Sequence, residues 1–356
     1  MDPAALRSSF PVLARVAYLN AGTNGPVPTA AVQAAQRELD SALHEGRTAA
    51  HYARRTELQH QLRARYASLL GCDAAEIALT TSTSEGLGRV LAGLEIGPGD
   101  EILTSDQEHP GLLGPLKAAR ARGAKIRFGP LARLAEHVTE ATTLVACSHV
   151  GWLGGELADR ALAEVPVPVI LDGAQGAGAV PVDVRALNCD AYAAAGQKWL
   201  CGADGTGLLY VSPELLERLL TIAPSYTSFA QPGKGIDAPL QSDASRHDTP
   251  SLARESVAFN VASYDTLGSG GWTTVFDRAA GLAEELASAL RARGRRVAPR
   301  GATTLVAWED DEPTATRQRL ADAAVVVRDL PNTPYLRASV GAWNHPDDLQ
   351  TLLSAA

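Results

Sequence analysis

The chain of 356 residues carries 32 lysines and arginines against 40 aspartates and glutamates, a formal net charge of −8. This negative balance argues against nucleic acid or an anionic membrane as the main partner. Hydrophobic residues make up 46% of the sequence, but no apolar run approaches the ~20 residues that span a bilayer. The length suits two domains, and the N-terminus lacks the basic and apolar stretches of a signal peptide, so we expect a cytoplasmic protein.

Short apolar runs alternate with stretches of helical spacing through the first two thirds of the chain. The predicted strands include 77–80, 101–104, 143–147 and 167–171, and the predicted helices include 111–122 and 160–164. Such alternation predicts an α/β domain whose mostly parallel sheet is covered by helices on both faces. We assign residues 16–244 to this large domain.

The last third of the chain has a different order of elements. Two long helices with apolar faces and three short strands are predicted, in the order 257–267, 274–293, 304–308, 324–328 and 335–340. A final helix is expected to start at Pro346. This order predicts a smaller α+β domain of residues 245–356, to which we add residues 1–15.

One of the four lysines in the chain has a notable setting. Lys198 lies in a glycine-flanked loop, Gly196 to Gly202, and Asp172 ends the apolar run at 167–171. This pair suits a site for pyridoxal phosphate (PLP), although both residue types are also common in such positions for structural reasons. Lys198 would hold the PLP aldehyde as a Schiff base, and Asp172 would pair with the protonated pyridine nitrogen so that the ring accepts electrons.

The segments around both residues resemble those of a known family. Leu171 to Ala177 is similar to the D-x-A-Q segment, and Gly196 to Gly207 to the lysine loop, of the class V aminotransferase family of fold-type I PLP enzymes. Members include cysteine desulfurases, carbon–sulfur lyases, isopenicillin N epimerase-like proteins and aminotransferases. Further matches run from Tyr18 to Asp348. The resemblance implies a large domain with a mostly parallel sheet of seven-stranded type and a small α+β C-terminal domain.

A hydroxyl-rich turn is the expected cradle for the phosphate of PLP. Thr80 to Gly86 follows a predicted strand and opens a helical stretch, where hydroxyls, N–H groups and the positive helix end favour an anion. An ordinary N-cap is the alternative interpretation. The family binds phosphate at this position, which implies Ser82, Thr83 and Ser84 as ligands. Gln197 stands where desulfurases usually carry a histidine that contacts the phosphate.

The resemblance implies roles for further residues around the ring. His109 matches the residue that stacks on the PLP face, with a solvated loop histidine as the alternative, and Gln175 matches a donor to the phenolic oxygen. Thr249 resembles the residue that reaches the phosphate of the neighbouring subunit, which implies a homodimer with shared active sites. Lys198, His109 and Asp172 then form the catalytic set.

Both ends of the chain are expected to contact the substrate. Arg337 matches the arginine that holds the substrate carboxylate, for which a guanidinium offers a two-pronged fit. Asn20 and Asn24 lie where the N-terminal segment of the family reaches the pocket, and turn chemistry is the alternative for both. The expected partner is therefore a small-molecule substrate, an amino acid.

The cysteines separate this chain from one branch of the family. Cys72, Cys147, Cys189 and Cys201 show no C-x-x-C spacing, so no metal site or disulfide framework is indicated. Desulfurases need a persulfide-forming cysteine on a mobile loop in the C-terminal third, and no cysteine follows Cys201. A persulfide relay is therefore not expected. The site residues serve elimination, transamination and epimerisation alike, and among these we favour a desulfurase-like, β-eliminating carbon–sulfur lyase acting through Lys198. An aminotransferase or an epimerase is the alternative, and a non-catalytic PLP-binding regulator is another.

Overall fold

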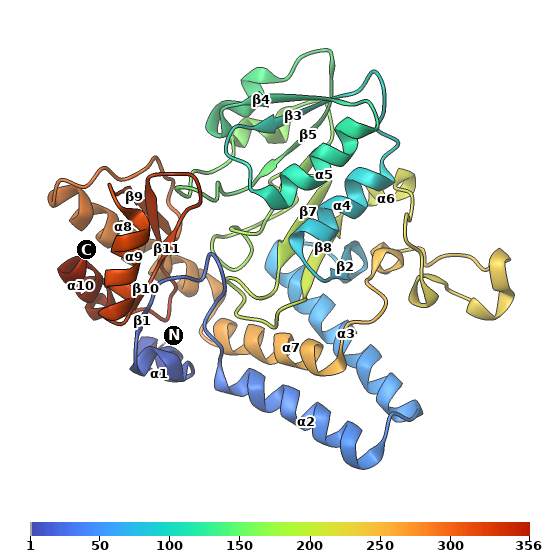
Figure 1. The fold of residues 1–356 in the computed structure, drawn as a ribbon. Coiled ribbons are helices and arrows are strands. Elements are labelled where there is room, and N and C mark those ends of the chain that lie inside the picture. The colour runs from blue at the N-terminus through green and yellow to red at the C-terminus, as the bar shows by residue number, and fades with distance from the viewer. Residues whose placement is uncertain (1) are drawn as a thin grey trace.

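A seven-stranded sheet runs through the centre of the larger part of the molecule (Figure 1). The computed structural model describes residues 2–356. The strand order is β2-β8-β7-β6-β5-β3-β4, in which β8 runs antiparallel to both neighbours and the other four pairs are parallel. The strands are β2 (Ile77–Thr80), β3 (Glu101–Ser105), β4 (Lys125–Gly129), β5 (Thr142–Ser148), β6 (Val169–Asp172), β7 (Ala191–Ala195) and β8 (Gly207–Val211).

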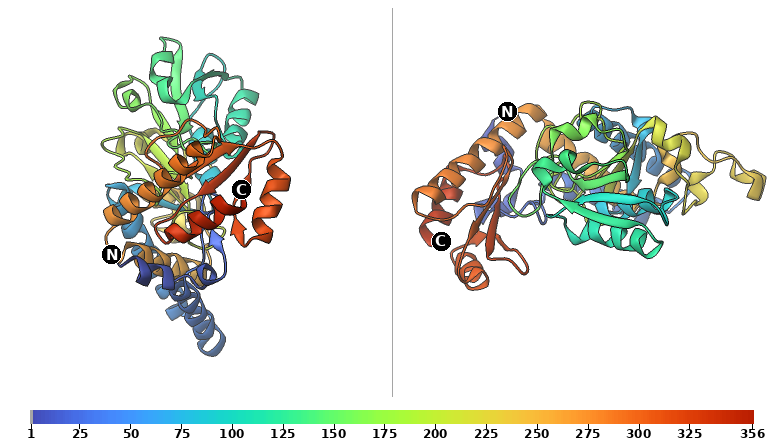
Figure 2. Two further views of the ribbon diagram at one scale, coloured as in Figure 1. Left: turned by 90° about the vertical axis from the view of Figure 1, so that its left-hand side faces the viewer. Right: turned by 90° about the horizontal axis from the view of Figure 1, so that it is seen from above.

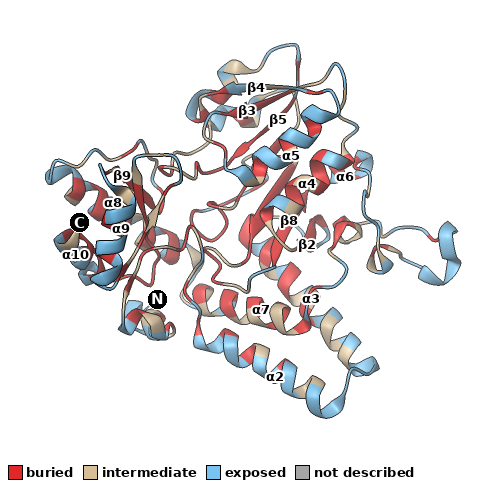
Figure 3. Cartoon of the chain, viewed as in Figure 1, coloured by how far each residue is buried: buried red, intermediate tan, exposed pale blue. Residues whose placement is uncertain are grey.

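Helices cover both faces of this sheet because its strands are apolar on both sides. Along β5, Val145 and Cys147 face one hydrophobic core, whereas Leu144 and Ala146 face the other. The helices of the large domain are α2 (Thr29–Glu45), α3 (Ala49–Leu70), α4 (Thr83–Gly93), α5 (Pro110–Ala121), α6 (Pro213–Arg218) and α7 (Arg254–Gly268). Figure 3 shows the buried sheet between them and the exposed outer faces of α2.

The smaller part of the molecule lies beside the large sheet (Figure 2). Its three-stranded antiparallel sheet has the order β11-β12-β9, and β1 pairs in parallel with β10. This pairing ties the N-terminal segment to the C-terminal one. The elements are α1 (Pro3–Ser8), β1 (Ala17–Tyr18), α8 (Trp272–Ala292), β9 (Leu305–Glu309), α9 (Pro313–Asp322), β10 (Val325–Val326), β11 (Arg328–Asp329), β12 (Tyr335–Ser339) and α10 (Pro346–Ala355).

The predicted fold class is confirmed, and two of the predicted elements differ in detail. The predicted helix at 160–164 is a 3₁₀ turn, since Val165 precedes a proline and is biased away from helix. The strand predicted at 324–328 is divided, because β10 pairs with β1 and β11 pairs with β12. Helices α2 and α3 were not predicted. None of the helices formed by residues 2–356 is long and apolar enough to cross a membrane.

Apolar contacts continue across the domain boundary that we predict between residues 244 and 245. α7 packs against α2 and α3, and its Val257 and Val261 belong to a core that also contains strands of the large sheet. The boundary stays a prediction.

A buried ion pair fastens the loop that carries Thr249 to the edge strand β2. Arg63 of α3 donates to both carboxylate oxygens of Asp248, at 3.1 and 2.8 Å. Asp248 Oδ1 also accepts from the N–H of Leu79 at 2.8 Å, and the Thr249 N–H donates to the Leu79 carbonyl at 2.8 Å. The position of Thr249 therefore depends on two charges that compensate each other inside the protein.

Removing one charge of this pair should destabilise the fold strongly. We expect Arg63→Met to lower the free energy of unfolding by about 3–5 kcal/mol, because the Asp248 carboxylate would stay buried without its partner. The Arg63→Met/Asp248→Leu double variant should recover most of this loss. Arg291→Ala, at a surface pair with Glu284, should cost less than about 1 kcal/mol. Urea unfolding measures all three, and a wild-type midpoint for Arg63→Met would contradict the expectation.

Candidate active site

The loops at one edge of the large sheet carry most of the predicted site residues. Asp172 is the last residue of β6, and Lys198 lies in the loop that follows β7. His109 is the N-cap of α5 after β3, and Ser82 is the N-cap of α4 after β2. These four strands run parallel, so their carboxyl ends meet at the same edge, where ligands of such sheets bind.

Lys198 and Asp172 form an electrostatically linked pair. Burial lowers the pKa of the Lys198 amine to about 8, the Asp172 carboxylate opposes this shift, and Arg337 and Arg328 lower the pKa further. Burial also raises the pKa of Asp172, whereas Lys198 and a 2.9 Å hydrogen bond from the Ala174 N–H hold it down. The Lys198 amine can thus lose its proton near neutral pH. The Asp172 carboxylate beside it stabilises a nearby cation.

The ring of His109 borders solvent and is neutral at pH 7. Its Nδ1 accepts the Gly111 N–H at 3.0 Å, which places the remaining ring proton on Nε2. Partial burial, and then the positive charges of Lys198 and Arg337, lower the pKa of His109 to about 4. A neutral, oriented imidazole suits the predicted stacking role.

A buried carboxylate next to His109 was not among the predicted residues. Glu108 accepts hydrogen bonds from Ser105 Oγ at 2.5 Å and from the Ser148 N–H and Oγ at 2.9 and 2.6 Å. Burial raises the pKa of Glu108 to about 7, against the effect of these donors. The contacts fix the loop before His109 to the end of β5.

The amide of Gln175 joins the large domain to the N-terminal segment. Its Oε1 accepts from Trp199 Nε1 at 2.9 Å, and its Nε2 donates to the Gly22 carbonyl at 2.8 Å. Gly22 is needed here, because a Cβ would lie 2.8 Å from Ser339 Oγ and 3.1 Å from Arg337 Nη2. One Nε2 hydrogen remains for the predicted contact with the cofactor.

Two arginines of the small domain face this site. Arg337 is only 2% exposed, and it stands directly opposite Arg328 in the β11–β12 pairing. Arg337 Nη1 donates to the Trp152 carbonyl, and Arg328 Nη1 donates to Thr23 Oγ1 at 3.2 Å. Burial, followed by the charge of Arg328, lowers the pKa of Arg337 to about 9. Within residues 2–356 no carboxylate pairs with either guanidinium, so the two together favour an anionic ligand.

The predicted phosphate cradle is only partly exposed. Ser82 Oγ accepts the Glu85 N–H at 3.1 Å, as an N-cap does, while Thr83 is buried and Ser84 is exposed. A Cβ on Gly111 would lie 2.7 Å from Ser84 Oγ, so the turn before α4 lies against the start of α5. The arrangement places the hydroxyl-rich turn beside His109.

Several buried polar atoms around the site have no hydrogen-bond partner among the described residues. They are Asn20 Oδ1, Thr83 Oγ1, Gln197 Oε1, Arg337 Nε and Ser339 Oγ. Buried polar atoms in proteins are nearly always hydrogen-bonded. Donors and acceptors concentrated in this way suit a polar ligand that both accepts and donates hydrogen bonds. The residues present therefore fit PLP with an amino-acid substrate.

Comparison with known proteins agrees with this geometry. The sequence profile of the family described as aminotransferase class-V matches residues 17–295. The chain belongs to the class-V aminotransferase family. A cysteine desulfurase from Dickeya dadantii is 32% identical over 246 residues, which are 60% of this chain and 58% of that relative. The chain thus matches less than two thirds of the length of this relative.

Two solved structures of the protein C-DES match nearly the whole chain. A C-DES mutant with glycine covalently linked to its PLP cofactor is 28% identical, with a TM-score of 0.91 and coverage of 98% of both chains. A complex of the cystine C–S lyase C-DES with its reaction product cysteine persulfide is also 28% identical, with a TM-score of 0.90 and coverage of 97% of this chain and 98% of that one.

For two of the predicted site residues of this class-V protein, Asn24 and Thr249, the contacts in the structure are not the predicted ones. Asn24 is exposed, and its backbone carbonyl accepts from the Tyr18 hydroxyl at 2.9 Å. The Thr249 hydroxyl donates to Glu85 of its own chain, 2.7 Å from each carboxylate oxygen. Burial alone would raise the pKa of Glu85, but hydrogen bonds from Thr81, Thr249 and other donors hold it at about 2. The roles of Asn24 and Thr249 stay predictions.

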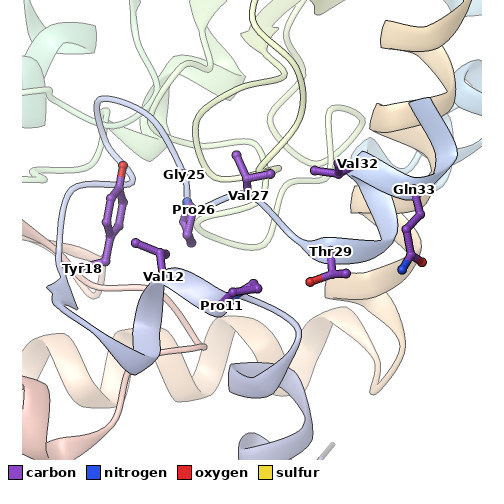
Figure 4. A pocket seen from close by; sticks show the side chains of 9 residues that line it. All are labelled: Pro11, Val12, Tyr18, Gly25, Pro26, Val27, Thr29, Val32 and Gln33. Carbon is purple, nitrogen blue, oxygen red and sulfur yellow. The ribbon is translucent and has the colours of Figure 1, made fainter. Parts of the chain in front are cut away.

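An apolar pocket of about 460 Å³ lies next to the lysine loop (Figure 4). Its lining residues are Pro11, Val12, Tyr18, Gly25, Pro26, Val27, Thr29, Val32 and Gln33. The Gly25 N–H donates to the Gln197 carbonyl at 2.7 Å, which joins this segment to the lysine loop. The pocket includes none of the predicted cofactor ligands, so it is separate from the site at the sheet edge.

The pKa of Lys198 should respond to the charge on Arg328. In the PLP-free protein with ¹³C-methylated lysines, NMR titration should give Lys198 a midpoint near pH 8. Arg328→Gln should raise this midpoint, because it removes a cation that disfavours the ammonium form. Arg328→Lys keeps the charge and should change the midpoint little. An unchanged midpoint in Arg328→Gln would show that Arg328 lies too far from Lys198 to act on it.

Proposed function

We propose that the protein is a PLP-dependent carbon–sulfur lyase that removes a sulfur substituent from the β-carbon of an amino acid. The observation that carries the proposal is the pair of buried or half-buried arginines, Arg328 and Arg337, beside Lys198 without a carboxylate partner. Two guanidinium groups suit a substrate with two carboxylates. Cystine, the substrate class of the neighbour C-DES, combines two carboxylates with a β-sulfur.

The residues of the chain would share the chemistry in a defined way. Bound PLP would supply an electron sink for the bond electrons released at the α-carbon. Lys198 Nζ would take the α-proton, which its lowered pKa permits near neutral pH. The Asp172 carboxylate would hold the cationic form of the ring nitrogen, and Arg337 would hold the α-carboxylate of the substrate. Burial of these groups would limit the access of water.

The cysteines favour release of the sulfur with the product over transfer to the protein. Cys147, Cys189 and Cys201 are buried, and burial raises the pKa of each thiol. The half-buried Cys72 has a pKa raised to about 12, mainly by burial. Because only the thiolate attacks sulfur readily, none of the four suits a persulfide relay.

An aminotransferase is the second candidate, and the same two arginines favour it. A dicarboxylic amino acid such as glutamate would also place one carboxylate on each guanidinium. Lys198 and Asp172 would serve both reactions. The fate of the substrate carbon distinguishes them, since elimination releases pyruvate and ammonia whereas transamination requires a keto-acid acceptor.

We also propose a homodimer with shared sites. The segment of residues 220–240 projects from the body of the large domain (Figure 1), and its Tyr226 and Ile236 are 77% and 93% exposed. Large apolar side chains on a projecting segment suit coverage by a second copy. Thr249, fixed by Asp248, would then approach the neighbouring subunit. The expected cytoplasmic location stays a prediction.

A product assay tests the proposed reaction. With PLP, the wild-type protein should release pyruvate and ammonia from cystine without any keto-acid acceptor. Lys198→Ala should lose turnover by several orders of magnitude, whereas Cys201→Ala should keep most of it. Formation of a new amino acid only when a keto acid is added would favour the aminotransferase. A persulfide on Cys201 that disappears with activity in Cys201→Ala would contradict release of the sulfur with the product.

The same assay tests whether Arg328 binds the second carboxylate of cystine. Arg328→Gln should raise KM for cystine by about tenfold, in line with loss of ~1.5 kcal/mol from a charged hydrogen bond. KM for S-methylcysteine, which has one carboxylate, should change little. An equal rise in KM for both substrates would mean that Arg328 does not bind the distal carboxylate of cystine.

A further inference from the structure

A small hairpin connects the large domain with the small domain at the edge of the site. It follows β5, and Val150 pairs with Leu157 in an isolated antiparallel bridge at its base. Its far end contacts the small domain, where the Gly155 carbonyl accepts from Thr303 Oγ1 at 2.8 Å and from the Gly301 N–H at 3.0 Å. Trp152 lies between these two attachments.

Close backbone contacts fix the hairpin in place. A Cβ on Gly154 would lie 2.4 Å from the Pro299 carbonyl oxygen, and one on Gly155 would lie 2.4 Å from Thr303 Oγ1. Gly155 also has a φ of +83°, a conformation that side chains disfavour. Both glycines let the small domain approach the hairpin directly. The position of Trp152 is therefore set by the two domains together.

The Trp152 residue contacts two of the predicted site residues. Its ring meets the His109 ring edge-on, with 5.2 Å between the centroids and 83° between the planes. Its carbonyl accepts from Arg337 Nη1. The side chain is half-buried, and its Nε1 donates no hydrogen bond within residues 2–356. Trp152 thus contacts the ring that borders the cofactor site through its indole, and the arginine that would hold the carboxylate through its backbone.

We propose that Trp152 is a specificity-determining residue whose indole contacts the sulfur substituent on the β-carbon of the substrate. The proposal rests on the proposed function. An amino acid with its carboxylate on Arg337 and its α-carbon near Lys198 would have its β-substituent close to both, and Trp152 contacts Arg337 and the His109 ring. Divalent sulfur is polarizable and makes favourable contacts with aromatic rings. The indole therefore favours thioether and disulfide substituents over hydrogen.

Binding of analogues that cannot react tests this role apart from turnover. The probes are 2-aminoisobutyrate and α-methyl-S-methylcysteine, which lack an α-proton and differ by the sulfur substituent. Calorimetry on the PLP-loaded protein gives a Kd for each. Wild type should prefer the sulfur analogue, and Trp152→Ala should reduce the ratio of the two Kd values by about two- to tenfold. Trp152→Phe should keep most of the preference, and Trp272→Phe, on α8, should keep all of it.

An unchanged ratio of the two Kd values in Trp152→Ala overturns the proposal, whether or not both analogues bind more weakly. If Trp152→Ala does not fold, as judged by circular dichroism, Trp152→Leu replaces it, and the same loss of preference is expected. Failure of the wild-type protein to release pyruvate from S-substituted cysteines would refute the lyase function. The ratio of the two Kd values would still decide whether the indole contacts the sulfur substituent.

Discussion

Positive charge gathered in a largely buried place is the constraint on which the rest of this structure depends. Burial, together with the charges of Arg337 and Arg328, lowers the pKa of Lys198, and burial and Arg328 lower that of Arg337, while Asp172 is the carboxylate that opposes the shift at Lys198. Such a concentration of cations is costly inside a protein unless anions compensate it. The carboxylates of the proposed substrate would supply that compensation at the two arginines.

The site needs both domains and the N-terminal segment. The large sheet supplies Asp172 and Lys198 at the carboxyl ends of neighbouring strands, whereas the small domain supplies the two arginines. β1 pairs with β10, and the N-terminal segment that follows β1 brings Gly22 next to both Gln175 and Arg337. Small changes in how the domains meet would therefore alter cofactor and substrate contacts together.

The sequence predicted those site residues whose position is determined by one strand or one helix alone. Asp172 ends an apolar strand and Ser82 caps a helix, and both patterns are readable within a few residues. Arg328 was missed because its relevance depends on register: it faces Arg337 only once β11 and β12 pair. The own-chain partner of Thr249, Glu85, lies 164 residues away in sequence, so no local pattern indicates the contact. Helix α2 was missed because only a few of its residues are buried.

The central claim is that the amine of Lys198, poised by these neighbours, is the point where PLP is attached. Borohydride treatment of the PLP-loaded protein, followed by peptide mapping, tests it directly. We expect the pyridoxyl group on Lys198 and no label in Lys198→Ala. A pyridoxyl group on Lys117, Lys125 or Lys234 in the wild-type protein would contradict it.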